Sequence, residues 1–354
     1  MPDDRHHGHD HGAAPAVPDD APVLVEVTRG GLVESRHRGA VAVVDAAGRL
    51  VFGLGDVAMP VYPRSSIKPI QALPLVESGA ADAFGLGDAE LALACGSHHG
   101  TPAHVATVTA WLDRVGPGVA ALECGPQVPS GVEVARALFA GGGEPATVHN
   151  NCSGKHAGMI ATAVHRGERI AGYVRPEHPV QQRILGTYEQ VCGCDLSRAP
   201  RGFDGCSVPV IAMPLANLAA GMARLARPNS LPTPRAKAAR RLLAAMAARP
   251  EMVEGDGSFC TEGMRAGGGN VLLKGGAEGM YVAILPALGL GIALKIQDGA
   301  KRAAEVAMAA VLRRLGAFDA AAMARLADRF TVSLANQAGR TIGEVRPATA
   351  LAAN

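Results

Sequence analysis

Short apolar and alternating stretches near the two ends of the chain predict β-strands. VLVEVTRG (23–30) is one such stretch, and two apolar runs on either side of an Ala-Ala-Gly turn predict a hairpin over residues 39–56. Strand patterns return after residue 270, in NVLLKGG (270–276), GMYVAILP (279–286) and LGLGIALKIQDG (288–299).

The middle of the chain has apolar residues at helical spacing instead. Several of these segments open with Asp, Ser or Thr, which cap helices, and close on Gly. We predict helices in DAELALACG (88–96), TPAHVATVTAWLDRVG (101–116), SGVEVARALFAGG (130–142), SGKHAGMIATAVHRG (153–167), PEHPVQQRILGTYEQVCG (176–193) and TPRAKAARRLLAAMAARP (233–250). A final helix, AKRAAEVAMAAVLRRLG (300–316), follows the last strands.

This order of elements disfavours a doubly wound parallel sheet, because no β-α-β alternation is sustained. We predict an α+β fold (mixed α/β) in which strands from both ends form one antiparallel sheet and the helical block stacks beside it. Residues 22–350 are predicted to be a single catalytic domain, with a sheet region over 22–60 and 268–350 and a helical region over 61–267. The Pro-rich segment 228–234 is interpreted as a surface loop.

Residues 1–21 form a tail without an apolar core, so we do not expect a secretory signal. The tail contains His6, His7, His9 and His11 among Asp and Pro residues. Such a tract can bind metals weakly, but a disordered, solvated tail is the simpler interpretation.

Composition narrows the possible partners. The 354 residues have a net charge of +2, and Lys and Arg are spread along the chain, which disfavours a nucleic-acid surface and favours a small-molecule partner. No apolar run approaches the roughly 20 residues that span a bilayer, so no membrane partner is expected. The seven cysteines are irregularly spaced, which argues against a disulfide framework and predicts a cytoplasmic location.

Ser65 and Lys68 form an S-x-x-K tetrapeptide that is the first candidate for catalysis. Pro69 is tolerated only in the first turn of a helix, so the helix must begin close to Ser65, with the serine hydroxyl at the positive end of the helix dipole. A lysine can take the serine proton only when the lysine is neutral, which burial or a nearby cation favours. The alternative is a helix cap followed by a solvated lysine, although the dipole disfavours a lysine in a first turn.

Four further stretches carry polar candidates: Ser97 in CGSHHG, Cys152 and Lys155 in HNNCSGKHAG, Asp204 and Cys206 in FDGCSVP, and Lys274 in GGGNVLLKGGAEG. Each has a structural alternative, since the cysteines can be small buried hydrophobes and Lys274 a turn residue. Together, the early S-x-x-K and the late Lys-Gly-Gly resemble the order of motifs in the penicillin-recognising serine enzymes. The middle S-D-N motif of those enzymes is absent, and Lys-Gly-Gly lacks the hydroxyl of K-T-G.

The sequence has a closer resemblance to the bacterial asparaginase II family, the Rhizobium etli-type asparaginases. The stretches RSSIKPIQALP, ACGSHHG, HNNCSGKHAGM, FDGCSVP and LLKGGAEG resemble motifs of that family, and TIGEVRP (341–347) resembles its usual end. The resemblance extends from residue 22 to 347. It implies a fold similar to serine β-lactamases and DD-peptidases, the hydrolysis of L-asparagine to aspartate and ammonia in asparagine catabolism, and a homodimer.

The resemblance also implies residue roles. Two Ser–Lys pairs are expected: Ser65 as nucleophile with Lys68 as its base, and Ser97 with Lys274 as a proton relay that tunes the first pair. Neighbouring lysines lower one another's pKa, so at least one can be neutral near pH 7. Backbone N–H groups at the helix start could hold the oxyanion.

A zinc ion (Zn²⁺) is implied as cofactor, bound through Cys152, Lys155, Cys206 and water. Paired thiolates are ordinary zinc ligands, whereas a lysine ligand must lose a proton. Arg64 is expected to bind substrate, and Asp204 to contact either the substrate's α-ammonium or the metal's ligands. Two alternatives stay open: hydrolysis of another amide, such as glutamine or a β-lactam, and a zinc-containing amino-acid binding protein without turnover.

Overall fold

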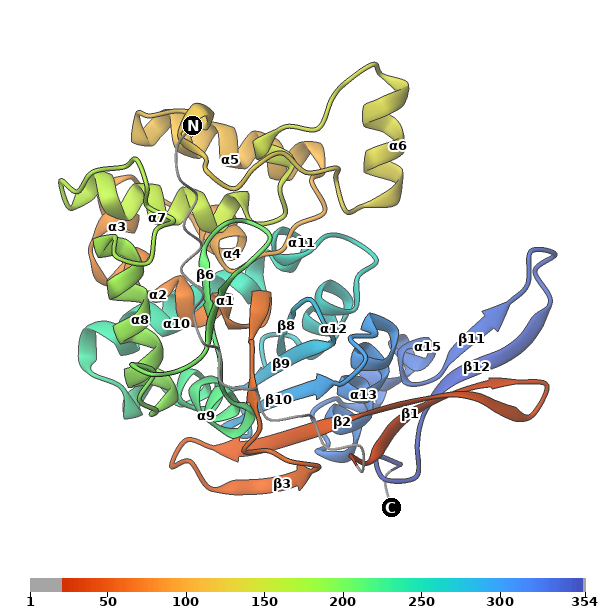
Figure 1. Ribbon diagram of the computed structural model, residues 1–354. Helices are drawn as coiled ribbons and strands as arrows, with labels where there is room; N and C mark the ends of the chain where they lie inside the picture. Colours follow the sequence, from red (N-terminus) through yellow and green to blue (C-terminus); the bar gives the residue numbers. More distant parts are fainter. Residues whose placement is uncertain (1–20, 353–354) are drawn as a thin grey trace, which may run out of the picture.

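The computed structural model describes residues 21–352, and its main feature is one eight-stranded antiparallel sheet (Figure 1). The strand order is β11-β12-β1-β2-β10-β9-β8, with β3 paired to β2. The strands are β1 (Val23–Arg29), β2 (Leu32–Asp45), β3 (Leu50–Leu54), β8 (Leu272–Gly275), β9 (Met280–Leu285), β10 (Leu290–Ile296), β11 (Val332–Ala335) and β12 (Thr341–Pro347). The predicted α+β class, with one sheet built from both ends of the chain, is therefore confirmed.

The 14-residue strand β2 joins the two halves of the sheet. Its first half pairs with β1, and its second half pairs with β10, with Val41 opposite Leu294 and Val43 opposite Ile292. Residues 40–44 are buried without alternation, which is typical of a strand covered on both faces. The hairpins β1–β2 and β11–β12 lie side by side and extend away from the helices (Figure 1).

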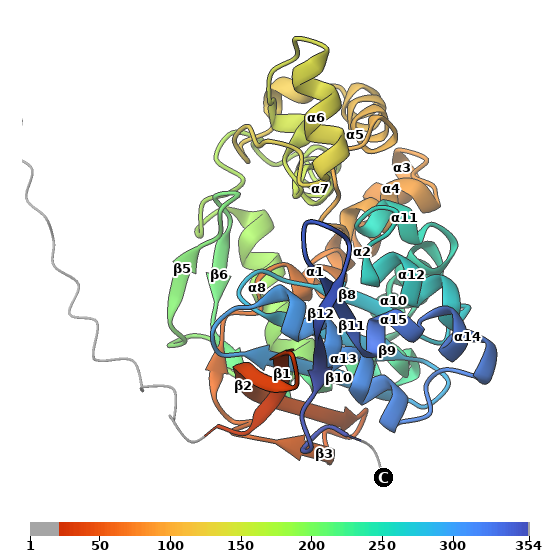
Figure 2. The same ribbon diagram turned by 90° about the vertical axis from the view of Figure 1, so that its right-hand side faces the viewer.

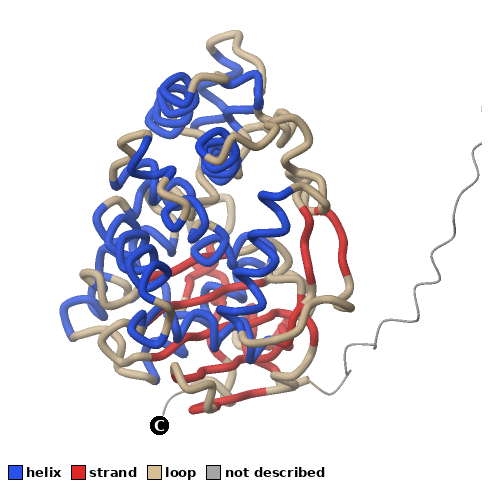
Figure 3. The backbone as a smooth tube through the Cα atoms, turned by 90° about the vertical axis from the view of Figure 1, so that its left-hand side faces the viewer, coloured by secondary structure: helices blue, strands red, loops and turns tan. Residues whose placement is uncertain are grey.

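The helices gather above and beside the sheet, as Figures 2 and 3 show from two sides. They are α1 (Lys68–Gln71), α2 (Leu73–Glu77), α3 (Ala80–Ala83), α4 (Asp88–Ala94), α5 (Pro102–Val115), α6 (Val132–Ala140), α7 (Ser153–His165), α8 (Pro179–Cys192), α9 (Leu215–Ala226), α10 (Thr233–Ala248), α11 (Pro250–Val253), α12 (Phe259–Gly267), α13 (Lys301–Arg314), α14 (Ala320–Arg325) and α15 (Ala327–Phe330). All six helices predicted for the middle of the chain, and the one after residue 300, are present.

Two short antiparallel strand pairs and four 3₁₀ turns complete the described part of the chain. The pairs are β4 (Pro60–Val61) with β7 (Met213–Pro214), and β5 (Arg201–Phe203) with β6 (Pro209–Ile211). The 3₁₀ turns are η1 (Arg64–Ile67), η2 (Val119–Ala121), η3 (Thr147–His149) and η4 (Pro228–Ser230). The last of these occupies the Pro-rich segment interpreted as a surface loop.

Helix α9 was not predicted, yet it packs directly on β10 and β2. The approach is so close that a Cβ at Gly291 would lie 2.1 Å from the carbonyl oxygen of Ala219. Only glycine permits this contact. The buried hydrophobic side chains of both regions form one cluster, in which small residues dominate and Trp111 is the largest member.

Other expectations from composition meet the structure as follows. All seven cysteines are free, so the prediction that they form no disulfide framework is confirmed. No helix among residues 21–352 is both long and apolar enough to cross a membrane. The predicted disorder of the histidine-rich tail falls on residues 1–20, outside the described part of the chain, apart from Ala21.

Candidate active site

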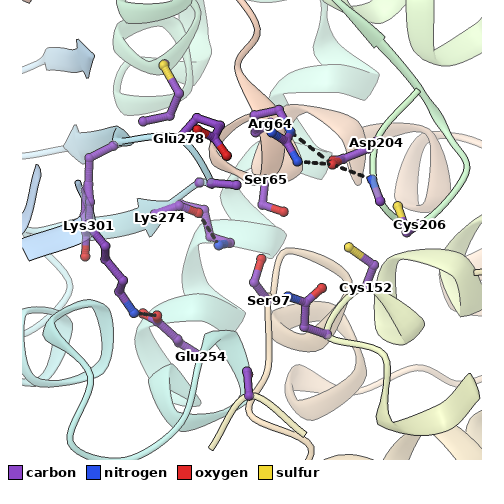
Figure 4. Close-up of a pocket in the computed structure, with 18 of the residues that line it drawn as sticks. Arg64, Ser65, Ser97, Cys152, Asp204, Cys206, Glu254, Lys274, Glu278 and Lys301 are labelled. Carbon is purple, nitrogen blue, oxygen red and sulfur yellow. Dashed lines mark hydrogen bonds and ion pairs between the residues drawn. The ribbon is translucent and has the colours of Figure 1, made fainter. Parts of the chain in front are cut away.

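All five candidate stretches line one cavity of about 510 Å³. It lies where the end of β8 meets the helical block, and its walls include Ser65, Ser97, Cys152, Asp204, Cys206 and Lys274 (Figure 4). Its volume falls in the range of roughly 300–1,000 Å³ that is usual for small-molecule sites. Segments far apart in sequence therefore bring hydroxyls, amines, thiols and a carboxylate to one place.

Backbone strain independently marks the same cavity. Arg64, Ser207 and Glu278 are the only non-glycine residues of the described chain with a positive φ, at 52°, 71° and 58°. Arg64 and Glu278 line the cavity, and Ser207 directly follows Cys206 of its wall. Such conformations are costly and cluster at functional sites, where the surrounding structure holds them. Nothing in the local sequence indicated this strain.

Ser65 lies in the 3₁₀ turn η1, which leads into α1. Pro69 occupies the first turn of α1, so the predicted helix start near Ser65 is confirmed, although the segment is divided into the short helices α1 and α2. The Ser65 hydroxyl has no hydrogen-bond partner among residues 21–352 and faces the cavity (Figure 4). It is free to approach a ligand.

Lys68 lies beneath this turn with only 1% of its surface exposed. Its ammonium donates a hydrogen bond of 2.9 Å to the Ser97 hydroxyl and another to the Gly96 carbonyl. Ser97 is held in turn by a 2.7 Å hydrogen bond from its N–H to the Val253 carbonyl. The structure thus brings Lys68 and Ser97 into direct contact, a link across the two expected Ser–Lys pairs.

Lys274 stands at the end of β8, as the sequence predicted, and is 1% exposed. Its ammonium donates a 2.6 Å hydrogen bond to the Gly275 carbonyl. Burial, together with the positive charge of Lys68, lowers the pKa of Lys274 from 10.5 to about 8. Gly276, two residues after Lys274, is a glycine for a steric reason. A Cβ there would lie 3.0 Å from backbone atoms of Pro63 and Ser66.

Arg64 and Asp204 form an ion pair on one wall of the cavity. The Arg64 guanidinium donates hydrogen bonds of 2.8 and 3.0 Å to one carboxylate oxygen of Asp204. Burial acts to raise the pKa of Asp204, but the charges of Lys155 and Arg64 outweigh it and lower this pKa. The wall therefore carries a cation and an anion next to the free Ser65 hydroxyl.

Cys152, Lys155 and Cys206 converge beside this pair. Cys152 precedes α7, Lys155 lies in its first turn, and Cys206 lies in the β5–β6 loop, with 3.0 Å between the Lys155 ammonium and the Cys206 sulfur. A hydrogen bond from Cys206 and the charge of Lys155 lower the pKa of Cys152 against the effect of burial. Burial opposes the charged form of Lys155, but the two sulfurs raise its pKa.

This donor set was tested for a fit to zinc. Among residues 21–352, no group of three or more His, Cys, Asp and Glu side chains is arranged to hold a metal ion, but a set of two cysteines and a lysine is of another kind. The Lys155 amine lies 3.0 Å from the Cys206 sulfur, a hydrogen bond from Cys206 and the charge of Lys155 lower the pKa of Cys152, and cysteine sulfurs are ordinary zinc donors. The residues therefore fit the expected ion, provided that Lys155 loses its proton.

Sequence reasoning missed a second group of charged residues in the cavity wall. Glu254, Glu278 and Lys301 line it, and Glu254 pairs with Lys301 at 3.0 Å. Glu254 opens the glycine-containing stretch EGDGS (254–258), the one local signal that could have marked it.

Comparisons with solved structures give low likenesses, which carry no conclusion about the reaction. A β-lactamase from Mycobacterium bovis is 15% identical with a TM-score of 0.40, covering 82% of this chain and 94% of that chain. A D-alanine carboxypeptidase from Burkholderia cenocepacia is 15% identical with a TM-score of 0.38, covering 79% and 93%. A class C β-lactamase from Rhodobacter sphaeroides is 13% identical with a TM-score of 0.38, covering 77% and 92%.

No curated protein matches this sequence. The model of one protein family, described as L-asparaginase II, matches residues 25–347. That match spans the sheet, the helical block and all five stretches that line the cavity. The chain belongs to the L-asparaginase II family of amidohydrolases.

Proposed function

We propose that this protein is an L-asparaginase that releases ammonia from L-asparagine through an acyl-enzyme on Ser65. The observation that carries the proposal is the unpartnered Ser65 hydroxyl, which faces the cavity near two buried lysines. A serine becomes nucleophilic only when a base takes its proton, and a lysine with a lowered pKa can supply that base.

The contact between Lys68 and Ser97 supports a proton relay between the two pairs. With its pKa near 8, Lys274 is neutral in a sizeable fraction of molecules and can accept a proton. We assign Ser97 to carry that proton from Lys68, to which it is hydrogen-bonded at 2.9 Å. Lys68, now neutral, takes the proton of Ser65 as the hydroxyl attacks the amide carbon. The same residues return the proton to the leaving ammonia.

The Arg64–Asp204 wall provides the charges that an amino acid requires. Arg64 would bind the α-carboxylate and Asp204 the α-ammonium, so that a substrate replaces their mutual ion pair with two of its own. Backbone N–H groups at the start of η1 would stabilise the oxyanion, and water would then hydrolyse the ester. The alternative for Asp204 is a contact with the ligands of the metal in place of the substrate's α-ammonium.

Zinc is proposed as the resident metal, held by Cys152, Lys155 and Cys206 with water. When bound, it would supply positive charge and a rigid anchor for this wall. The reaction itself is carried out by residues of the chain. The two cysteines and Lys155 contribute by positioning the β5–β6 loop, which carries Asp204.

The test is the rate of ammonia release from asparagine by Ser65→Ala, compared with Ser66→Ala. Ser66 is the next residue, and its hydroxyl is bound to the Pro63 carbonyl at 2.6 Å, away from the reaction. We expect Ser65→Ala to lose at least about a thousandfold in kcat, in line with the loss of an activated nucleophile, and Ser66→Ala to keep most activity. Near-normal turnover by Ser65→Ala would contradict the acyl-enzyme.

The two alternatives give different outcomes. Faster turnover of glutamine or of a β-lactam than of asparagine would identify a hydrolase of another amide. Thermal stabilisation by asparagine without any aspartate formed would identify a binding protein.

A further inference from the structure

The cavity has a second charged wall on the far side of Ser65. In Figure 4, Ser65 and Lys274 lie between the Arg64–Asp204 pair on one side and the Glu254–Lys301 pair on the other. The first pair accounts for the charges of an amino acid, and the second remains without a role. Asparagine is also much smaller than the ligands for which a cavity of about 510 Å³ is usual.

Glu254 is the unusual member of this second wall. It is 8% exposed, and one carboxylate oxygen accepts a 3.0 Å hydrogen bond from Lys301, whereas the other oxygen has no partner at hydrogen-bond geometry in the described chain, although the Cys260 thiol lies beside the carboxylate. A buried carboxylate oxygen without a partner is costly, so it calls for an explanation such as a bound ligand.

The position and charge of Glu254 are fixed by its surroundings. Its carbonyl accepts a 2.7 Å hydrogen bond from the His99 N–H, which anchors the backbone at the cavity. Burial acts to raise its pKa, but the charges of Lys301 and Lys274 lower it, so Glu254 is a carboxylate at neutral pH.

In the ion pairs of this wall, carboxylates outnumber ammonium groups, although the charge of Lys274 also acts on Glu254. Lys301 also lies 3.6 Å from Glu305, so its single positive charge is shared between two glutamates. Glu278 lines the same cavity nearer to Arg64 (Figure 4) and makes no side-chain hydrogen bond or ion pair with residues 21–352, although its charge acts on Lys295. These carboxylates would repel an anionic group of a ligand, whereas an ammonium group would donate a hydrogen bond to the second carboxylate oxygen of Glu254.

The geometry of asparagine directs its amide nitrogen to this wall. In an amide, the carbonyl carbon is planar and carries the oxygen, the nitrogen and the Cβ at roughly equal angles, so the nitrogen points away from the Cβ. With the α-groups at Arg64 and Asp204 and the carbonyl carbon at Ser65, we expect the amide nitrogen on the side of Ser65 away from that pair, which is the side where Glu254 and Lys301 lie (Figure 4).

We propose that the Glu254 carboxylate, beside Lys301, forms an amine subsite, which takes the departing ammonia as ammonium once the ammonia has gained a proton from solvent, and which binds primary amines carrying a second positive charge. This proposal rests on the proposed acyl-enzyme at Ser65. An amine bound there attacks the ester carbon in place of water. The new C–N bond forms, the bond to the Ser65 oxygen breaks, and the proton lost by the amine passes through the lysines to that oxygen. The product is an N-substituted asparagine.

The test offers two amines to the full-length wild-type protein during asparagine turnover. Singly protonated ethylenediamine has one free amine and one ammonium, whereas 2-methoxyethylamine has no second charge. Mass spectrometry measures the ratio of N-substituted asparagine to aspartate at equal concentrations of free amine. We expect about a tenfold higher ratio with ethylenediamine, the size of effect that one partly buried charge pair gives.

Two variants shift this ratio in opposite directions. Glu254→Gln should lower the ethylenediamine ratio to that of 2-methoxyethylamine, and Lys301→Gln, which removes the competing cation from an exposed side chain, should raise it. The matched control is Glu133→Gln on α6, which removes the carboxylate of an exposed ion pair with Arg136 outside the cavity and should leave the ratio unchanged.

Equal ratios for the two amines in the wild-type protein would overturn the amine subsite, and so would an unchanged preference in Lys301→Gln. If the wild-type protein forms aspartate but no N-substituted asparagine from either amine, the amine subsite is overturned and the proposed asparaginase activity stands. No ammonia from asparagine at all would overturn both.

Discussion

At the residue scale, the decisive feature is that two lysines share a buried site with unequal partners. Lys68 has both a hydroxyl and a carbonyl to receive its protons, whereas Lys274 has only the neighbouring Gly275 carbonyl. Burial and the charge of Lys68 disfavour the charged form of Lys274 more than the charge of Glu254, to which Lys274 makes no hydrogen bond, favours it. Sequence motifs placed both lysines at the site, but they could not distinguish them, because the difference arises from hydrogen bonds between distant segments.

The pH dependence of turnover should therefore follow Lys274. With its pKa near 8, it is protonated and unable to accept a proton below that pH, and neutral above it. We expect kcat/KM for asparagine to rise with pH through about 8 and then to level off. Initial rates of ammonia release across this range provide the measurement.

Lys274→Arg separates this role from that of a simple positive charge. A guanidinium stays protonated in proteins and cannot accept the proton. We expect a loss of about 10²–10⁴-fold, the usual contribution of an acid–base group. A variant that keeps normal rates would mean that only the charge of Lys274 is needed.

At the element scale, most of the secondary structure could be predicted because its helices and strands have a polar face, so that polar and apolar residues recur at helical or strand spacing. Helix α9 escaped because nine of its twelve residues are buried, which leaves little polar periodicity to detect. The hairpin β11–β12 escaped for the opposite reason: its short strands are largely exposed or half-buried, and a single buried position, Val345, gives no alternation. Tertiary packing, and not the local sequence pattern, determines the secondary structure of both segments.

The packing of α9 on β10 predicts a large cost for a small substitution. In Gly291→Ala, the new methyl group meets the backbone of Ala219 and Ala223, and backbone cannot move aside as a side chain can. We expect a loss of at least about 1–3 kcal/mol in the free energy of unfolding, as in overpacked cores. Chemical denaturation measures the loss.

Gly186→Ala is the matched control. Gly186 lies within α8, and a Cβ there meets nothing within 4 Å. The same substitution should stabilise the protein by about 0.5–1 kcal/mol, because alanine loses less backbone entropy in a helix. Equal effects of both substitutions would show that the close approach at Gly291 is not structurally important.

At the scale of the whole molecule, the five motif stretches indicated segments that lie together, since all five line one cavity. Glu254 and Lys301 could not be predicted in the same way, because neither carries a motif and their contact depends on how α13 sits against the segment before α12. The single-domain boundaries, the homodimer and the cytoplasmic location stay predictions from sequence and resemblance.

Zinc binding should be visible as a property of the whole molecule. The cysteines and Lys155 join α7 to the β5–β6 loop, so an ion held by both segments binds the folded chain and stabilises it by mass action, by about 2.7 kcal/mol when free zinc is a hundredfold above its dissociation constant. Elemental analysis of the purified protein should find about one zinc per chain. A chelator should remove the metal and lower the melting temperature.

Cys206→Ser tests the assignment of the ion to this site. It should abolish zinc content and the response to chelator, because the hydroxyl is a far weaker zinc ligand than the thiolate. Cys194→Ser is the control, since Cys194 is a half-buried free thiol that does not line the cavity, and its zinc content should stay normal. Zinc retained in Cys206→Ser would place the ion elsewhere. A wild-type protein that is purified without zinc and is not stabilised by added zinc would mean that Lys155 stays protonated and is the permanent partner of the two sulfurs.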